Sequence, residues 1–152
     1  MRQPRIALIG CGTVAERYYV PALRRHHDVV RAMYLVDTNR QSAQKIHTEL
    51  GGGRVSENLN DVLPDLDGAI ILLPNSLHFP VALECLKAGV HVLCEKPLAE
   101  LPDQAERLID AAHEKNVSLC VNNTRRLFPT FRRIKEVIDA GSLGSLQEIE
   151  YC

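Results

Sequence analysis

The sequence predicts a doubly wound α/β fold, in which helices cover both faces of a parallel sheet. Short, continuously apolar runs, such as residues 6–9, 69–73 and 90–94, alternate with helical patterns along most of the 152 residues. Strands that are apolar on both sides are typical of a parallel sheet buried between helices. Regular alternation of strands and helices with crossover connections then gives the doubly wound arrangement.

The elements are expected in a simple chain order. The strands are predicted at 6–9, 29–36, 54–56, 69–73, 90–94 and 117–121, and the helices at 13–25, 40–50, 80–87, 101–112 and 131–141. In the fourth helix, Leu101, Ala105 and Leu108 recur at the spacing of one helical stripe. Pro21 should kink or end the first helix near Val20, because proline has no backbone N–H to donate.

The last segment has a different pattern. Ile149 and Tyr151 alternate with Glu148 and Glu150, which is typical of a strand with one solvent-facing side in an antiparallel sheet. A single strand of this kind is not stable alone. We therefore expect residues 1–123 to form the α/β domain. We expect 124–152 to be the junction helix and first strand of a C-terminal α/β domain that is missing here. The apolar side of this strand favours self-association into a homo-oligomer.

Composition argues against several classes of protein. Lys and Arg number 18 against 19 Asp and Glu, so the formal net charge is −1 and no positive excess favours nucleic acid. The apolar runs are far shorter than the roughly 20 residues that cross a membrane, and the N-terminal run lacks the features of a secretory signal. The five cysteines include no CxxC pair, which indicates buried thiols in a reducing cytoplasm and no metal site.

Residues 10–15, Gly-Cys-Gly-Thr-Val-Ala, match the pattern G-x-G-x-x-A between the first strand and the first helix. In this pattern the first glycine permits a tight turn, and the second lets backbone N–H groups approach a pyrophosphate closely. The small Ala15 lets the helix pack near the strand, and the helix N-terminus favours the negative charge. Taken alone, the pattern also fits an ordinary glycine turn.

Asp37 lies about 20 residues after this motif, at the end of the second apolar run, where a carboxylate accepts hydrogen bonds from an adenosine ribose. An N-cap of the next helix is the alternative. Together, the glycine motif and Asp37 predict dinucleotide binding. A carboxylate at this position repels a 2′-phosphate and so favours NAD. Arg40 is close enough to soften this preference, and NADP stays possible.

Two later loops carry unusual residues, Leu-Pro-Asn-Ser-Leu-His at 73–78 and Cys-Glu-Lys-Pro-Leu-Ala at 94–99. With these loops and the glycine motif, the chain resembles the N-terminal half of the Gfo/Idh/MocA oxidoreductases. Arg-Leu-Phe-Pro at 126–129 and Gly-Ser-Leu-Gly at 141–144 extend the resemblance over essentially the whole chain. It implies a Rossmann domain followed by an α/β domain that usually carries a catalytic histidine in D-x-x-x-H. No D-x-x-x-H follows Lys96, so residues 1–152 alone are expected to be inactive.

The resemblance also implies an activity and its residues. The activity is NAD(P)-dependent hydride transfer between nicotinamide and a sugar, cyclitol or related polyol. Lys96 is the implied catalytic residue, because a fixed ammonium stabilises a developing alkoxide and can relay its proton. The implied cofactor-binding residues are Gly10, Gly12, Thr13 and Val14 at the pyrophosphate, Asp37 and Arg40 at the adenosine, Leu73, Pro74, Asn75 and His78 along the middle, and Glu95, Lys96, Pro97 and Asn123 toward the nicotinamide.

Other interpretations stay open at this point. Lys96 also fits a surface ion pair with Glu95, and His78 fits a helix cap. A basic cluster after the last strand also fits a solvated or domain-contact face, with Arg126 as a further substrate contact; it comprises Arg125, Arg126, Arg132, Arg133 and Lys135. A non-catalytic dinucleotide sensor or scaffold would keep the glycine motif without needing Lys96. A methyltransferase would have no use for the Glu-Lys-Pro loop.

Overall fold

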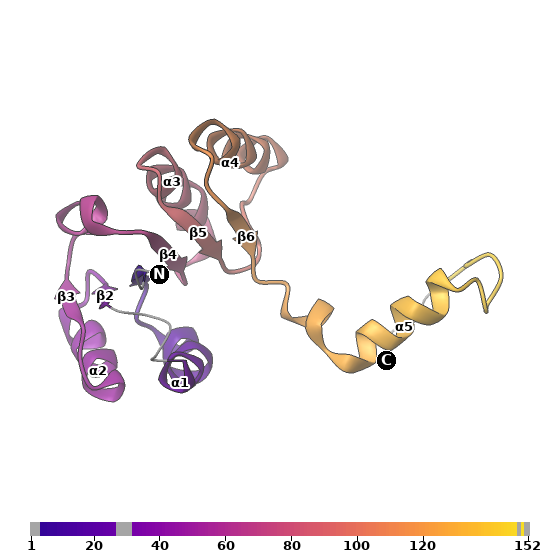
Figure 1. The fold of residues 1–152 in the computed structure, drawn as a ribbon, viewed down its shortest axis with the longest axis horizontal. Coiled ribbons are helices and arrows are strands. Elements are labelled where there is room, and N and C mark those ends of the chain that lie inside the picture. Colours follow the sequence, from indigo (N-terminus) through magenta and orange to yellow (C-terminus); the bar gives the residue numbers. More distant parts are fainter. Residues whose placement is uncertain (1–3, 27–31, 149, 151–152) are drawn as a thin grey trace. The chain divides into compact units, whose positions relative to one another are not determined.

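The computed structural model describes residues 4–26, 32–148 and 150. It contains a six-stranded, fully parallel sheet in the order β3-β2-β1-β4-β5-β6 (Figure 1). The strands are β1 (Arg5–Ile9), β2 (Ala32–Val36), β3 (Arg54–Ser56), β4 (Gly68–Ile71), β5 (His91–Cys94) and β6 (Leu119–Val121). The order reverses between β1 and β4, as it does in doubly wound folds. The predicted fold class is confirmed.

Helices connect the strands and cover both faces of the sheet. The longer ones are α1 (Val20–Arg25), α2 (Arg40–Leu50), α3 (Asn75–Lys87), α4 (Pro102–Lys115) and α5 (Pro129–Asp139). Shorter helical turns are η1 (Ala15–Tyr19), η2 (Leu59–Asp61), η3 (Leu63–Asp65) and η4 (Thr124–Leu127). In Figure 1, α1 and α2 lie on one side of the strands, and α3 and α4 lie on the other. None of the described helices is long and apolar enough to cross a membrane.

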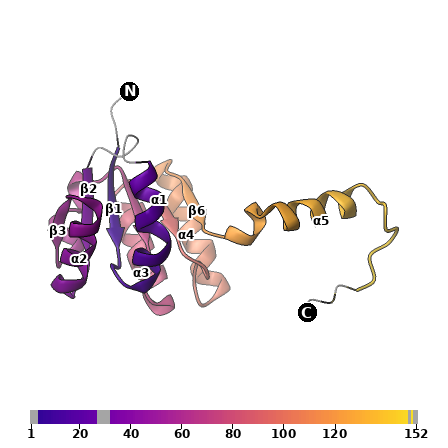
Figure 2. The ribbon, with the colours of Figure 1, turned by 90° about the horizontal axis from the view of Figure 1, so that it is seen from below.

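Two apolar cores explain why the central strands carry apolar residues on both faces. On β1, Leu8 packs in the core that includes Val20 of α1 and Ile46 of α2. Its neighbours Ala7 and Ile9 point to the opposite face and pack in the core beneath α3 and α4. Successive side chains of a strand point to opposite faces, so each face needs its own apolar set. Figure 2 shows α1 in front of β1.

The sequence predicts that Pro21 kinks or ends the first helix near Val20, but the helix continues through Pro21. Residues Ala15–Tyr19 form a π-helical turn, in which the N–H of Val20 donates to the carbonyl oxygen of Ala15, and α1 continues directly from it. Pro21 therefore stands in the first turn of α1, where the lack of an N–H costs least. At Val20, where the sequence predicts a kink or an end, the structure changes from a π-helical to an α-helical turn.

Two other boundaries differ from the prediction. α3 begins at Asn75, with Pro80 inside it, whereas the sequence placed its start at Pro80. A proline this early in a helix removes a single hydrogen bond near the helix start, so the helix tolerates it. The preceding strand accordingly ends at Ile71 and not at residue 73. Residues 29–31 of the second predicted strand lie outside the described residues.

Residues 123–152 form a second compact unit, which contains η4 and α5, while residues 1–122 form the first. The strand predicted over 147–152 is not present in its described residues Gln147, Glu148 and Glu150. A strand without a neighbour leaves its backbone groups unpaired, which explains this difference. Ile149, Tyr151 and Cys152 lie outside the described residues.

The glycine turn after β1 packs tightly against a neighbouring backbone. Gly10 has φ +94°, and its N–H donates to the carbonyl oxygen of Val36 at 2.9 Å. A Cβ atom at Gly10 would lie 2.8 Å from the carbonyl oxygen of Leu72. At Gly12, by contrast, an added Cβ would meet nothing within 4 Å. Gly10 therefore allows the turn to pack against the backbone at Leu72, whereas Gly12 leaves open space above the backbone.

Replacing these glycines should separate the two purposes. Gly10→Ala is expected to lower the free energy of unfolding by about 2–4 kcal/mol, because it combines a left-handed backbone with a backbone clash. Gly12→Ala should change it by less than about 1 kcal/mol. Urea unfolding followed by circular dichroism measures both values. Equal losses in the two variants would contradict this account of the turn.

Candidate functional site

The carboxyl ends of the parallel strands gather the residues that the sequence singled out. The glycine turn follows β1, Asp37 follows β2, Leu73 and the start of α3 follow β4, and Glu95 follows β5. Ligands of doubly wound sheets bind at this edge, beside the point where the strand order reverses. The structure therefore brings these residues to one edge of the first unit.

The exposed part of the glycine motif fits a diphosphate. Gly12, Thr13 and Val14 are exposed, and the carbonyl oxygen of Gly12 accepts the N–H of Glu16 at 3.1 Å where the helix begins. Because no atom lies within 4 Å of the position of a Cβ at Gly12, a phosphate can approach the backbone there. Free N–H groups at a helix start attract such an anion.

Asp37 links this turn to the end of β2. One carboxylate oxygen, Oδ2, accepts the N–H of Cys11 at 2.8 Å, and the other, Oδ1, accepts the N–H of Asn39 at 2.8 Å. Asn39, whose side chain accepts the N–H groups of Gln41 and Ser42, is the N-cap of α2. The interpretation of Asp37 as that N-cap is therefore wrong. Its carboxylate fixes the glycine turn and remains partly exposed beside it.

A cavity of about 280 Å³ lies next to Asp37. Its walls come from the ends of β1 and β2, the segment after β3, and the 73–84 region that contains α3. The residues around it include Ile9, Val36, Asp37, Asn58, Leu73, Leu77 and Val81. An apolar cavity with a carboxylate at its rim suits a nucleoside. Arg40 forms an exposed ion pair with Glu57, with Nη1 and Oε1 3.0 Å apart.

His78 joins two loops of the site from beneath. Its ring is 1% exposed, with Nδ1 2.5 Å from the carbonyl oxygen of Pro97 and Nε2 2.7 Å from that of Leu73. His78 lies inside α3 and does not cap it. The ring therefore holds the loop after β4 against the loop after β5. Pro74, at the end of the first of these loops, and Asn75, the first residue of α3, are exposed.

The loop after β5 presents Glu95 and Lys96 in different environments. Glu95 is half-buried, and its Oε1 accepts the hydroxyl of Tyr19 at 2.8 Å and the amide N–H of Asn122 at 2.8 Å. Its Oε2 accepts the backbone N–H of Lys96 at 3.1 Å. Burial raises the pKa of Glu95, but these hydrogen bonds outweigh it, and the pKa lies below its usual value. Glu95 is therefore a carboxylate at neutral pH.

Lys96 is exposed, and its peptide bond to Pro97 is cis. Within the described part of the chain, its ammonium has no ion-pair partner at 4 Å or less. The charges of Lys96 and Glu95 therefore form no close ion pair, although the ammonium helps to lower the pKa of Glu95. An uncommitted ammonium at the carboxyl edge of the sheet can stabilise negative charge on a bound molecule.

Sequence reasoning missed two residues of this cluster, Tyr19 and Asn122. Asn122 is the first residue after β6, and a polar residue at the end of a strand could have been predicted as part of the site. Tyr19 lies in a helical stretch and has no comparable signal in the sequence around it. The sequence instead named Asn123, which begins the second unit. The role predicted for Asn123 stays a prediction.

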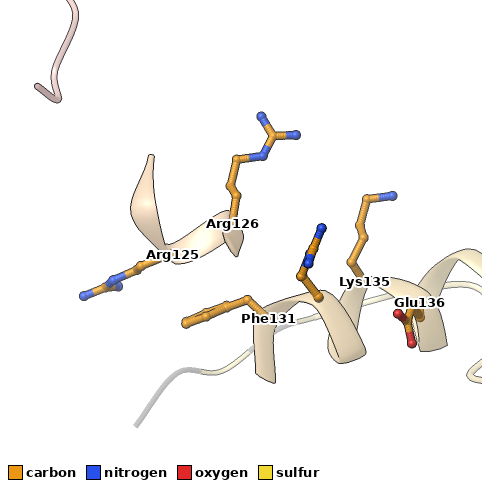
Figure 3. Close-up of a pocket in the computed structure, with 6 residues that line it drawn as sticks. Arg125, Arg126, Phe131, Lys135 and Glu136 are labelled. Carbon is orange, nitrogen blue, oxygen red and sulfur yellow. The ribbon is translucent and has the colours of Figure 1, made fainter. Parts of the chain in front are cut away.

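The second unit carries the basic cluster. A cavity of about 470 Å³ there is lined by Arg125, Arg126, Phe131, Arg132, Lys135 and Glu136. Figure 3 shows that Arg126 and Lys135 extend to the same side of their helical segments. Lys135 forms an ion pair with Asp139, and Arg133 forms one with Glu136. Most of these side chains are exposed, and the roles predicted for them, as a solvated or a domain-contact face, stay predictions.

Known proteins resemble this chain in sequence and in fold. A 1,5-anhydro-D-fructose reductase from Ensifer adhaerens is 32% identical over 142 residues, which are 92% of this chain and 42% of that protein. The structure of a 3-ketoreductase from Actinomadura kijaniata, solved with NADP and TDP-benzene, has a TM-score of 0.83 and 30% identity. The WlbA dehydrogenase from Bordetella pertussis, solved with NADH and UDP-GlcNAcA, has a TM-score of 0.86 and 30% identity.

The extent of these matches differs between the chains. The two structures are matched over 92% and 94% of this chain, but over only 43% and 41% of their own lengths. The chain thus spans less than half the length of these relatives. Residues 4–123 match the family model described as an oxidoreductase family with an NAD-binding Rossmann fold. With its glycine turn, Asp37 and the Glu-Lys-Pro loop at one edge of the sheet, the chain belongs to the Gfo/Idh/MocA oxidoreductase family.

Proposed function

We propose that this protein binds NAD(H) and takes part in hydride transfer between the nicotinamide and a sugar, cyclitol or related polyol. The observation that carries the proposal is the open backbone at Gly12, joined through Cys11 to the Asp37 carboxylate. The exposed Lys96 at the same sheet edge adds a group for chemistry. The relatives support the substrate class, since one reduces an anhydro-sugar and another is a 3-ketoreductase.

The proposed cofactor contacts run along the edge of the sheet. Gly10 shapes the turn, and the N–H groups of Gly12, Thr13 and Val14 bind the diphosphate. Asp37 accepts hydroxyls of the adenosine ribose beside the 280 Å³ cavity. The middle of the cofactor lies along Leu73, Pro74 and Asn75, which His78 holds in place from below. Glu95 is assigned to the nicotinamide end, where Pro97 shapes the loop.

Lys96 is the proposed catalytic residue. The cofactor, when bound, supplies or accepts the hydride. During reduction of a carbonyl, the Lys96 ammonium stabilises the negative charge that grows on the substrate oxygen and then donates a proton to it. During oxidation of the alcohol, a neutral Lys96 amine accepts that proton. The exposed position of Lys96 leaves its ammonium available for this contact.

NAD is the proposed cofactor in preference to NADP. A 2′-phosphate would lie beside the Asp37 carboxylate and be repelled by it. Arg40, the nearby cation that would relieve this repulsion, already forms an ion pair with Glu57 at 3.0 Å. Solved relatives hold either NADP or NADH.

We also propose a cytoplasmic protein that self-associates. Burial raises the pKa of the Cys11, Cys85 and Cys94 thiols to about 12, and these cysteines are free, which supports a reducing compartment. Phe128 and Ile134 of the second unit are exposed, and exposed apolar groups favour association. The apolar residues named for this role from the sequence, Ile149 and Tyr151, lie outside the described residues.

The cofactor preference can be measured by titrating the chain with NADH and NADPH and following nucleotide fluorescence. NADH should bind at least about tenfold more tightly than NADPH. Asp37→Asn, which removes the charge and keeps one acceptor oxygen, should lower that ratio about tenfold. Asp103→Asn, an exposed site in α4, makes the same change of charge and should leave the ratio unchanged. No binding of either nucleotide by the folded chain at millimolar concentration would refute the proposed function.

The catalytic role of Lys96 is tested in the natural protein with NADH and a panel of keto sugars. Lys96→Ala should lower the turnover number by about 10²-fold or more, while the affinity for NADH changes by less than about threefold. Lys87→Ala, an exposed lysine at the end of α3, is the matched control and should retain full turnover. Unchanged turnover in Lys96→Ala would favour a non-catalytic, dinucleotide-binding sensor or scaffold.

A further inference from the structure

Three side chains from distant parts of the first unit form a closed ring of hydrogen bonds. Tyr19 comes from the π-helical turn η1, Glu95 from the loop after β5, and Asn122 from the end of β6. The hydroxyl of Tyr19 lies 2.8 Å from Glu95 Oε1, and Asn122 Nδ2 lies 2.7 Å from that hydroxyl and 2.8 Å from Glu95 Oε1. Each member of the ring therefore contacts the other two.

The donors and acceptors of this ring fit one arrangement. The Asn122 amide donates one N–H to the Tyr19 oxygen and the other to the Glu95 carboxylate, and the Tyr19 hydroxyl donates a hydrogen bond to Glu95. If the Asn122 amide were flipped, its oxygen would face the Glu95 carboxylate, and two acceptors would repel each other. Glu95 therefore acts as a pure acceptor in its charged form. Only Oε2, which accepts the N–H of Lys96 at 3.1 Å, has acceptor capacity left for a ligand.

Backbone bonds fix the positions of these side chains. The N–H of Glu95 donates to Ile71 at 3.0 Å, and that of Asn122 donates to Cys94 at 2.8 Å, which extends the sheet one residue beyond β5 and β6. The π-helical turn sets the direction of Tyr19, which is half-buried, while its neighbour Tyr18 is 68% exposed. A cluster that is built from three elements and engages both oxygens of the carboxylate is organised in advance of binding.

We propose that Tyr19 and Asn122 are positioning residues that hold the Glu95 carboxylate ready for a hydroxyl of the nicotinamide-side ribose. This role rests on the proposed dinucleotide function. Tyr19 and Asn122 act through Glu95 and not on the cofactor itself. Because Glu95 Oε2 also accepts the N–H of Lys96, the same ring helps to fix the backbone from which the catalytic lysine extends. The ring thus governs the nicotinamide end of the site and leaves the diphosphate end to the glycine turn.

Tyr19→Phe tests this division, because it removes only the hydroxyl. The chain is titrated with NADH and, separately, with ADP, which has the adenosine and diphosphate but lacks the second ribose. The affinity for NADH should fall about tenfold, and that for ADP should change by less than about twofold. Tyr18→Phe is the matched control on the same turn and should leave both affinities within about twofold of wild type.

A second measurement reports on Glu95 without any cofactor. Carbon-13 NMR titration of the Glu95 carboxyl should give a pKa below its usual value in the wild type, and Tyr19→Phe and Asn122→Ala should both raise it. Thermal unfolding verifies that each variant is folded. A Glu95 pKa that neither variant changes would overturn the ring as the device that positions the carboxylate.

The two titrations also distinguish failure of this role from failure of the proposed function. If the wild type binds ADP and NADH, but Tyr19→Phe weakens both equally or neither, the positioning role is wrong and dinucleotide binding stands. If the folded wild type binds neither nucleotide, the proposed function is wrong, and the role derived from it is overturned with it.

Discussion

The close contact between Gly10 and the backbone at Leu72 is the constraint on which the rest of the site depends. A Cβ at Gly10 would lie 2.8 Å from the Leu72 carbonyl oxygen, so the chain can pass over the end of β4 only without a side chain. This path carries the N–H of Cys11 to the Asp37 carboxylate at 2.8 Å. It also leaves the backbone at Gly12 exposed. Tight packing at one glycine thus creates open space at the next.

A second constraint acts at the other end of the sheet edge. The backbone bonds from Glu95 to Ile71 and from Asn122 to Cys94 continue the parallel pairing past the last strand residues. Parallel pairing holds adjacent strand ends at one level, so the side chains of Glu95 and Asn122 meet. His78 adds a link beneath, between the carbonyl oxygens of Leu73 and Pro97. The site is therefore held by backbone pairing and by buried side chains that need not touch a ligand.

The sequence revealed what depends on local pattern, and the structure added what depends on distant contacts. The doubly wound sheet, the glycine turn and the acidic residue after β2 follow from short-range signals, namely apolar runs, φ preferences and spacing. Tyr19 and Asn122 are 103 residues apart, and their hydrogen bond exists only once the sheet is assembled. The start of α3 was misplaced because a proline that usually begins a helix stands within one here. Burial of His78 likewise depends on a loop 19 residues away.

The contrast between Glu95 and Lys96 indicates how one loop can serve both binding and chemistry. Glu95 is engaged by Tyr19, Asn122 and the N–H of Lys96, and such a group holds a ligand in one place because it cannot rearrange cheaply. Lys96 is exposed, and a lysine that already satisfied a carboxylate would lose that interaction whenever it turned to a substrate oxygen. The proposed hydride transfer would use both properties, a fixed group for binding and an exposed cation for the substrate oxygen. Glu95, whose carboxylate is held by hydrogen bonds, and Lys96, whose side chain is exposed, provide both on one loop. No separate helix or strand is needed for each group.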